Sequence, residues 1–134
     1  MSEYELVSKL MKKLKGEGFR VMTEVSNMGQ SADIVATRGK WVTVIEVKKQ
    51  NWNRAIQQCE AHKQIADYIC IAVASVSVPT RLAELAMGAG FGLLHYRRDE
   101  DEFEWVLKPQ MNKQVWRPQR KYWARARRRM SYAD

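Results

Sequence analysis

The feature that most constrains this chain is a pair of apolar, β-rich runs joined by a short turn. Residues 31–50 read SADIVATRGKWVTVIEVKKQ, and the turn falls at residues 38–40 around a glycine. Runs rich in Val, Ile and Thr on both sides of such a turn predict a β-hairpin. Three charged residues interrupt the runs, namely Asp33, Glu46 and Lys48. The sequence therefore predicts a sheet that carries two carboxylates and an ammonium group.

The register of that hairpin decides whether the charged side chains meet. Alternate residues of a strand share a face, so Glu46 and Lys48 point to the same side. A loop of two or four residues places Asp33 on that side too, whereas an odd loop without a bulge sends it to the opposite face. Neighbouring carboxylates on a half-buried face repel each other and lose solvation. A salt bridge to Lys48 would relieve one of them, and a divalent cation such as Mg²⁺ would relieve both.

The rest of the chain predicts the element order αβββαβαββ, followed by a basic tail. Ser2 and Glu5 form an S-x-x-E capping box, with Ser2 as the N-cap of the first helix. Alternation of strands and helices in this order predicts an α/β domain with a mixed sheet packed by helices. The expected helices span residues 2–15, about 52–66 and 80–90, and the expected strands span residues 19–25, 32–37, 41–48, 68–76, 91–97 and 102–108.

The positive charge lies in the C-terminal tail. The net charge is +8, and residues 1–107 are neutral, with 14 Lys/Arg and 14 Asp/Glu. Residues 108–134 carry nine Lys/Arg and one acid. We therefore expect a domain over residues 1–107 and a nucleic-acid-binding extension over residues 108–134, because neutralising phosphates releases counterions. The cations expected to bind nucleic acid there are Lys113, Arg117, Arg120, Lys121, Arg125, Arg127, Arg128 and Arg129.

Aromatic residues in the same tail argue against a merely solubilising terminus. Trp116, Tyr122, Trp123 and Tyr132 interleave with the cations. Such rings can stack on bases or dock on the body of the protein.

Two helices bring further polar residues toward the hairpin. Glu3 lies three residues before Leu6, so it is expected on the stripe that faces the core, where an acid needs a partner. The helix after the hairpin carries Arg54, Gln58 and His62 at successive i, i+4 positions along one edge.

Together these residues resemble the PD-(D/E)xK nuclease superfamily, which has the restriction-endonuclease-like fold with an αβββαβ core. The resemblance covers about residues 1–75 and includes the order of elements. It departs from the family at Ala32, where proline is usual, and at His62, where tyrosine is usual. The matching positions are Glu3 on the first helix, Asp33 of SADIVA, Glu46-Val47-Lys48 as the E-x-K, and Gln58 to His62 against Q-x-x-x-Y.

The resemblance implies Mg²⁺-dependent hydrolysis of DNA phosphodiesters, with Mn²⁺ able to substitute. It implies that Asp33, Glu46 and the Val47 carbonyl hold the metal, and that Glu3 binds a second ion or a coordinated water. Lys48 would position the attacking water. The catalytic set is Glu3, Asp33, Glu46, Lys48 and Gln58, with Arg54 and His62 on the nucleic acid.

The expected substrate follows from the small size and basic charge of the chain. Contacts should fall mainly on phosphates, which carry no sequence information, so we expect an endonuclease with structure-guided or weak sequence specificity. Family analogy adds a Holliday-junction-resolvase-like or nicking activity and leaves a homodimer open, with RNA as an alternative substrate. Two rival classes also stay open: a non-catalytic nucleic-acid-binding protein, and an interaction module whose tail docks on an acidic protein.

The sequence also predicts a compartment. No apolar run approaches the ~20 residues that span a bilayer, and the first residues are charged and amphipathic rather than signal-like. Cys59 and Cys70 fall at apolar positions and are expected to be buried free thiols. These features predict a cytoplasmic protein, nucleoid-associated or in a host cytoplasm if the chain is phage-encoded.

Overall fold

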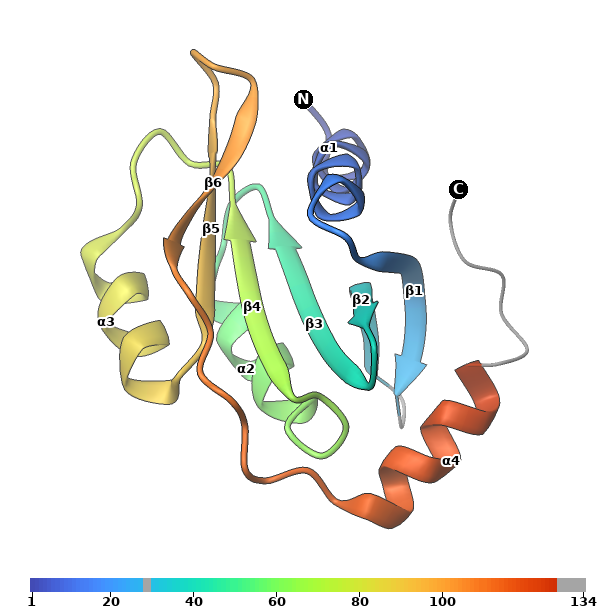
Figure 1. Ribbon diagram of the computed structural model, residues 1–134. Helices are drawn as coiled ribbons and strands as arrows, with labels where there is room; N and C mark the ends of the chain where they lie inside the picture. Colours follow the sequence, from blue (N-terminus) through green and yellow to red (C-terminus); the bar gives the residue numbers. More distant parts are fainter. Residues whose placement is uncertain (28–29, 128–134) are drawn as a thin grey trace.

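The computed structural model describes residues 1–27 and 30–127, with side chains for residues 1–23 and 32–125. These ranges contain six strands and four helices, and the strands form a single layer with helices on its two faces (Figure 1). Their bounds are α1 (Glu3–Gly16), β1 (Arg20–Asn27), β2 (Gln30–Arg38), β3 (Trp41–Lys48), α2 (Asn53–Ala61), β4 (Tyr68–Val73), α3 (Thr80–Ala89), β5 (Gly92–Arg97), β6 (Glu102–Leu107) and α4 (Arg117–Arg127).

The six strands form one mixed sheet in the order β1-β2-β3-β4-β5-β6. The first three strands are antiparallel, β3, β4 and β5 are parallel, and β6 is antiparallel to β5. Parallel neighbours need a crossover connection, and α2 and α3 supply the two that this sheet requires. The predicted α/β class, mixed sheet and order αβββαβαββ are confirmed. The helix α4 in the tail was not predicted.

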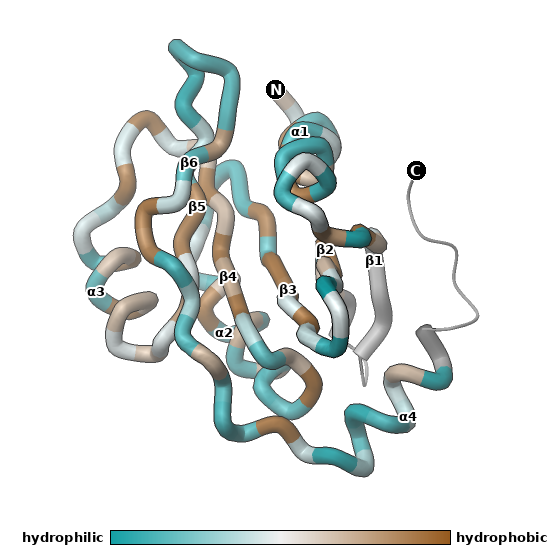
Figure 2. The backbone as a smooth tube through the Cα atoms, viewed as in Figure 1, coloured by the Kyte–Doolittle hydropathy of each residue, from teal (hydrophilic) through white to brown (hydrophobic). Residues whose placement is uncertain are grey.

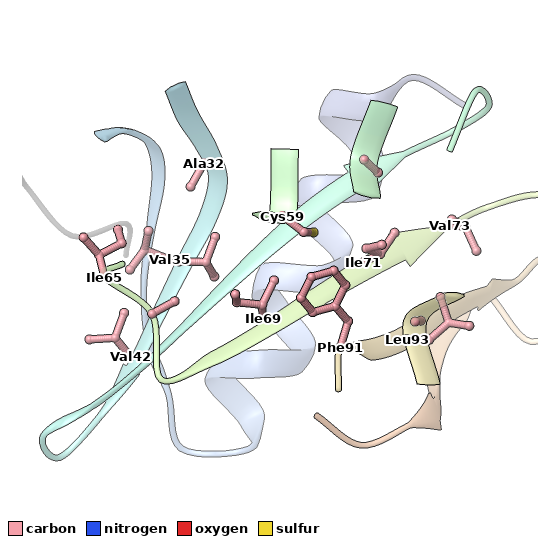
Figure 3. Close-up of a cluster of buried hydrophobic side chains, with 14 of the residues drawn as sticks. Ala32, Val35, Val42, Cys59, Ile65, Ile69, Ile71, Val73, Phe91 and Leu93 are labelled. Carbon is pink, nitrogen blue, oxygen red and sulfur yellow. The ribbon is translucent and has the colours of Figure 1, made fainter. Parts of the chain in front are cut away.

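Helices cover both faces of the sheet. On one face α1 contributes Leu6, Leu10 and Leu14 to a buried cluster with β2 and β3 residues. On the other face α2 and α3 pack over a second cluster, part of which Figure 3 shows around Ile69, Ile71 and Phe91. The central strands β3 and β4 are therefore buried on both sides, as expected for the middle of an α/β sheet.

The first helix begins as predicted. The Ser2 hydroxyl accepts a hydrogen bond from the Glu5 backbone N–H at 3.1 Å and donates one to the Glu5 carboxylate at 3.3 Å. Ser2 is thus the N-cap, as the S-x-x-E pattern predicts, and the Glu5 carboxylate binds the Ser2 hydroxyl, whereas in a full capping box it accepts from the N-cap backbone N–H. Gly18 then adopts a φ of 93°, which lets the chain turn directly into β1.

The hairpin between β2 and β3 has the short, even loop that brings the charged residues together. Arg38 pairs with Trp41, so two residues form the turn, and Gly39 takes a φ of 59°. The ladder continues in register to Ile34, which pairs with Ile45. One further step would place Asp33 opposite Glu46, as predicted for a loop of two residues.

The second helix is shorter than predicted, because it ends at Ala61 rather than at residue 66. The chain then forms tight turns, in which the Ile65 and Ala66 N–H groups both donate to the His62 carbonyl. The Asn112 side-chain amide donates to the carbonyls of Lys63 and Ala66, at 2.6 and 2.8 Å. A residue from the tail therefore stabilises this non-helical end.

The two cysteines are free and buried, as expected. Burial raises the pKa of the Cys59 thiol well above its ordinary value and that of Cys70 to about 12. Both thiols thus stay protonated near neutral pH and belong to the packing rather than to reactive chemistry.

No helix in the described ranges 1–27 and 30–127 is long and apolar enough to cross a membrane.

Candidate active site

The site forms where β2 leaves β3. The ladder between these strands stops at Ile34 and Ile45, whereas β2 remains paired with β1 through Ala32 and beyond. The Val47 N–H therefore lacks a ladder partner on β2. The Asp33 carboxylate accepts that hydrogen bond through Oδ2 at 2.8 Å, which fixes the side chain beside the end of β3.

Glu46 lies immediately behind Asp33 and has no exposed surface. One of its oxygens, Oε1, shares a 2.7 Å hydrogen bond with Nε2 of His62, which is also fully buried. The other oxygen, Oε2, is buried without a hydrogen-bond partner in the described part of the chain. Burial raises the pKa of Glu46 to about 7, and the nearby charge of Asp33 adds to this rise while His62 opposes it.

His62, rather than Lys48, is therefore the protein partner of Glu46. Lys48 follows Glu46 by two residues on the same strand and is half-buried. Among the residues whose side chains are described, its ammonium forms no ion pair with a carboxylate. The salt bridge considered between Lys48 and the hairpin acids is absent there.

The predicted role of His62 at the nucleic acid does not fit its position. An imidazole with no exposed surface cannot touch a phosphate in solvent, whereas its hydrogen bond holds the Glu46 carboxylate in one orientation. The i, i+4 spacing after Gln58 was the signal that put His62 on this face of α2. No pattern in the sequence indicated that its partner would be Glu46.

A pocket of about 430 Å³ opens beside Asp33, between the first half of α1 and the ends of the strands. Glu3, Asp33 and Val47 are among its lining residues. The Glu3 carboxylate accepts a 3.4 Å hydrogen bond from the Lys49 N–H, which holds it near the end of β3. Glu3 is exposed, so the prediction that it lies on the buried stripe is wrong: it precedes the stripe by one turn and borders the pocket instead.

Two further predicted residues lie on α2 ahead of His62. Gln58 precedes it by one turn, and its side-chain oxygen Oε1 is buried without a hydrogen-bond partner within the described ranges. Arg54, another turn earlier, is exposed. The row therefore runs from an exposed cation through a half-buried amide to the buried imidazole.

The donor atoms at the divergence of β2 and β3 suit a hard divalent cation. Asp33 and Glu46 supply neighbouring carboxylates, and one Glu46 oxygen has no protein partner among the described residues. The N–H and C=O of one strand residue point to the same edge, so the Val47 carbonyl is directed toward the side where Asp33 binds the Val47 N–H. Mg²⁺ takes one or two carboxylates and keeps several waters.

A larger protein cage is not seen in the described part of the chain, where no three His, Cys, Asp or Glu side chains are placed to hold one metal ion. Two carboxylates and a carbonyl fit the small ligand set that Mg²⁺ accepts. The residues present are therefore compatible with the implied metal.

The tail carries a row of cations on the outside of α4. Arg117, Lys121 and Arg125 recur every four residues and are exposed, and α4 is mostly hydrophilic in Figure 2. The opposite side of the helix holds Gln119 and Trp123, which are 6% and 3% exposed. Trp123 belongs to the same buried cluster as α2 and α3 residues. One of the four tail aromatics thus docks on the body.

Other predicted tail contacts have different positions. Arg120 donates to the Ile65 carbonyl at 2.6 Å and forms an ion pair with Asp67 at 3.2 Å, so it fastens α4 to the body and is not free for a phosphate. Lys113 is exposed. The side chain of Arg127 and the predicted contacts Arg128, Arg129 and Tyr132 lie outside the described residues.

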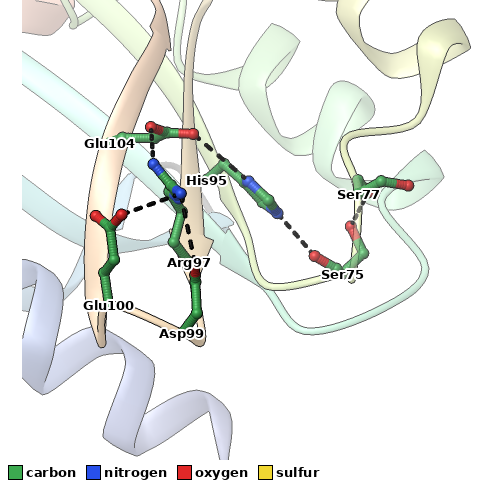
Figure 4. Close-up of polar contacts among 7 residues, drawn as sticks. All are labelled: Ser75, Ser77, His95, Arg97, Asp99, Glu100 and Glu104. Atoms are coloured by element: carbon green, nitrogen blue, oxygen red, sulfur yellow. Dashed lines mark hydrogen bonds and ion pairs between the residues drawn. The ribbon is translucent and has the colours of Figure 1, made fainter.

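A second polar cluster deserves comparison because it brings a serine, a histidine and a glutamate together (Figure 4). His95 Nε2 donates to the backbone carbonyl of Ser75 at 2.8 Å, and its Nδ1 lies 4.0 Å from Glu104. The Ser75 hydroxyl donates to the Ser77 carbonyl instead of to His95. The imidazole cannot act as base for this hydroxyl in that arrangement, so the cluster stabilises the turn region rather than forming a nucleophilic triad.

Comparison with known proteins adds the fold but no activity. No family model and no curated protein matches this chain. Among solved structures, AF1548, a protein of unknown function, is similar with a TM-score of 0.60 and 21% identity over 75% of this chain and 62% of that chain. SfsA of Pyrococcus furiosus, solved in complex with Ca²⁺, gives a TM-score of 0.48 and 15% identity over 80% of this chain and 64% of its own. This chain thus spans less than two thirds of either protein.

Proposed function

We propose that this protein is a divalent-cation-dependent nuclease of the PD-(D/E)xK type that hydrolyses DNA phosphodiesters. The observation that carries the proposal is the placement of the Asp33 and Glu46 carboxylates together where β2 and β3 separate. Lys48 lies two residues beyond Glu46 on β3, and an open pocket adjoins Asp33. Neighbouring carboxylates of which one is buried and one half-buried are costly in a purely structural role, whereas a cation neutralises both.

The metal would be held by Asp33, Glu46 and the Val47 carbonyl. When bound, a divalent cation lowers the pKa of the attacking water, orients it, and neutralises charge at the phosphate. The protein's own part is to keep the ligands in place: the Val47 N–H fixes Asp33, and His62 fixes Glu46.

Lys48 and Glu3 complete the proposed chemistry. The Lys48 ammonium would position the attacking water and stabilise the negative charge that develops on the phosphate. We assign it a positioning and electrostatic role rather than that of a base. Glu3, at the border of the pocket, would bind a second ion or the attacking water.

DNA would be bound mainly through its phosphates. The exposed row Arg117, Lys121 and Arg125 on α4 supplies three charges at regular spacing, and Arg54 supplies one nearer the site. Such contacts orient a duplex without reading its sequence. We therefore propose structure-guided or weakly specific endonuclease cleavage that leaves a 5′-phosphate.

A cleavage assay tests this proposal directly. Supercoiled plasmid, linear duplex, branched DNA and RNA would each be incubated with the protein and Mg²⁺ or Mn²⁺, and in EDTA. We expect metal-dependent nicking of at least one DNA substrate, and a loss of about 100-fold or more in rate for Asp33→Asn, which removes a metal ligand. Glu84→Gln, an exposed acid on α3, is the matched control and should cleave normally. Full activity of Asp33→Asn, or no cleavage of any substrate, would contradict the proposal.

The second candidate is a non-catalytic nucleic-acid-binding protein. The hydrogen bond between Glu46 and His62 favours it, because a buried pair can exist for structure alone. A pure binder would hold DNA equally well in EDTA and in Mg²⁺, and Asp33→Asn would leave its binding unchanged while no substrate is cut.

A further inference from the structure

A second cavity, about 320 Å³ in volume, lies at the other end of β3 from the candidate active site. Trp41 opens β3, and Glu46 follows five residues later, which corresponds to about 17 Å along an extended strand. The cavity is aromatic: its lining includes Phe19, Trp41, Tyr68 and Trp105, from four separate segments of the chain. Nothing in the proposed cleavage chemistry uses this cavity.

Cations accompany the rings of this aromatic cavity. The guanidinium of Arg38 lies 4.5 Å from the centre of the Phe19 ring, and the Lys108 ammonium lies 4.2 Å from that of Trp105. Both cations line the cavity. Arg38 is also held by a 3.2 Å hydrogen bond to the Glu17 carbonyl, which leaves other donors of its guanidinium for a ligand.

These features restrict the kind of ligand that fits. A cationic ligand would be repelled, because Arg38 and Lys108 are already in place and Glu17, which accepts a hydrogen bond from Trp105 Nε1, is paired with Lys13 at 2.9 Å. A purely apolar ligand would leave both cations without an anionic partner. A flat ring that carries an adjacent anion satisfies both the aromatic lining and the charges.

We infer that the aromatic cavity binds an unpaired base of a DNA strand, with the neighbouring phosphates held by Arg38 and Lys108. Base faces stack on aromatic side chains in proteins that hold single strands. Trp41 is 39% exposed at the start of its strand, so one large ring is accessible to a base. A base inside a duplex is stacked between its neighbours, so only an unpaired base can enter.

The aromatic cavity lies near the point where α4 is attached to the body. The Arg120 guanidinium donates to the Lys40 carbonyl at 3.2 Å, which fastens the start of α4 to the β2–β3 turn. Lys40 in that turn lies 4.7 Å above the Trp41 ring. A strand bound along α4 therefore meets the cavity at this turn. For the proposed nuclease, this would select substrates with single-stranded segments; that consequence rests on the proposed function, whereas base binding itself does not.

The test is fluorescence anisotropy with a labelled oligo-dT strand and a blunt duplex of equal length, in EDTA so that no cleavage occurs. Trp41→Ala should weaken single-strand binding about fivefold to a hundredfold, the effect typical of losing one stacking ring. Its binding to the duplex should change less than twofold. Trp41→Phe, which keeps a ring, should retain most of the affinity. Met87→Ala removes an exposed apolar side chain on α3 and is the control, expected to bind normally.

A second variant protects the test against a folding defect in Trp41→Ala. Lys108 is exposed, and Lys108→Glu should weaken single-strand binding tenfold or more without changing the thermal unfolding temperature. Unchanged single-strand affinity in both variants would overturn the inference, as would an equal loss on strand and duplex. Because no metal is present, these outcomes are independent of whether Asp33→Asn abolishes cleavage.

Discussion

Glu46 is a carboxylate without exposed surface, and its hydrogen bond to His62 determines how it is presented. A buried acid that loses its partner bears the full cost of desolvation. The 2.7 Å contact between Nε2 and Oε1 is a hydrogen bond whose donor depends on the tautomer of the imidazole. His62 is therefore a positioning residue in the proposed site.

Replacing His62 should reveal that positioning role. His62→Ala should lower the free energy of unfolding by about 3 to 5 kcal/mol, the usual cost of breaking a buried pair, and should weaken Mn²⁺ binding to the folded protein. His62→Gln, which keeps a donor, should recover part of both. Gln58→Ala, one turn away, serves as the control for stability. Denaturant titration measures the change in stability, and Mn²⁺ titration measures the change in metal affinity. If folded His62→Ala binds Mn²⁺ as tightly as the wild type, His62 contributes to packing only and does not position Glu46.

The raised pKa of Glu46 predicts a pH dependence of stability in the metal-free protein. The ordinary value is 4.5 and the folded value is about 7, so between these values the folded state keeps a proton that the unfolded chain has lost. The contribution of this proton to stability is complete below about 4.5 and disappears as the pH rises through 7. Denaturant titrations from pH 5 to pH 8 should show this fall, and Glu46→Gln should flatten it. The same pH dependence in both proteins would contradict the burial of an ionisable Glu46.

Among the helices and strands, the features predicted correctly from the sequence are those that depend on contacts between residues close together in the chain. The S-x-x-E cap, the strands 41–48 and the even loop of the β2–β3 hairpin follow from neighbouring residues, and the structure contains them. The early end of α2 depends on Asn112, which is about 50 residues away, and no pattern within the helix signals it.

The helix α4 illustrates the same limit. Its sequence is so polar that an isolated helix there would have little apolar surface to bury. The clustered charges predicted only the outer, solvent-facing side of the helix. The Gln119–Trp123 spacing is the one local sign of an inner face, and the apolar surface that receives Trp123 comes from the body. Deleting the tail would therefore remove part of the core together with the cations, and it cannot separate binding from folding.

Charge substitution on α4 separates these effects. Replacing Arg117, Lys121 and Arg125 with Gln keeps Trp123 in place and should reduce the slope of log affinity for duplex DNA against log salt concentration by up to about 2.7 units, at roughly 0.9 per lost phosphate contact. The control triple variant Lys12→Gln, Arg81→Gln, Arg98→Gln removes the same charge from other exposed positions. Binding measured from 50 to 300 mM salt checks this, and equal slopes for the two variants would contradict a specific role for α4.

In the whole molecule, the two ends of β3 border two different candidate sites. The carboxylates lie where β3 ends, and the aromatic cavity lies where β3 begins, next to the attachment of α4. The sequence predicted the first set, because acids stand out in apolar strands. It did not reveal the second, because Phe19, Trp41, Tyr68 and Trp105 are far apart along the chain and come together only through the sheet order.

The central claim is that Asp33 and Glu46 share a divalent cation. Anomalous diffraction from a crystal soaked in Mn²⁺ at pH 8, where Glu46 is ionised, tests it most directly. The account predicts a peak within about 2.0–2.3 Å of both carboxylates and of the Val47 carbonyl oxygen, absent from an Asp33→Asn crystal treated in the same way. A wild-type site without a peak, with Glu46 still bound only to His62, would contradict it.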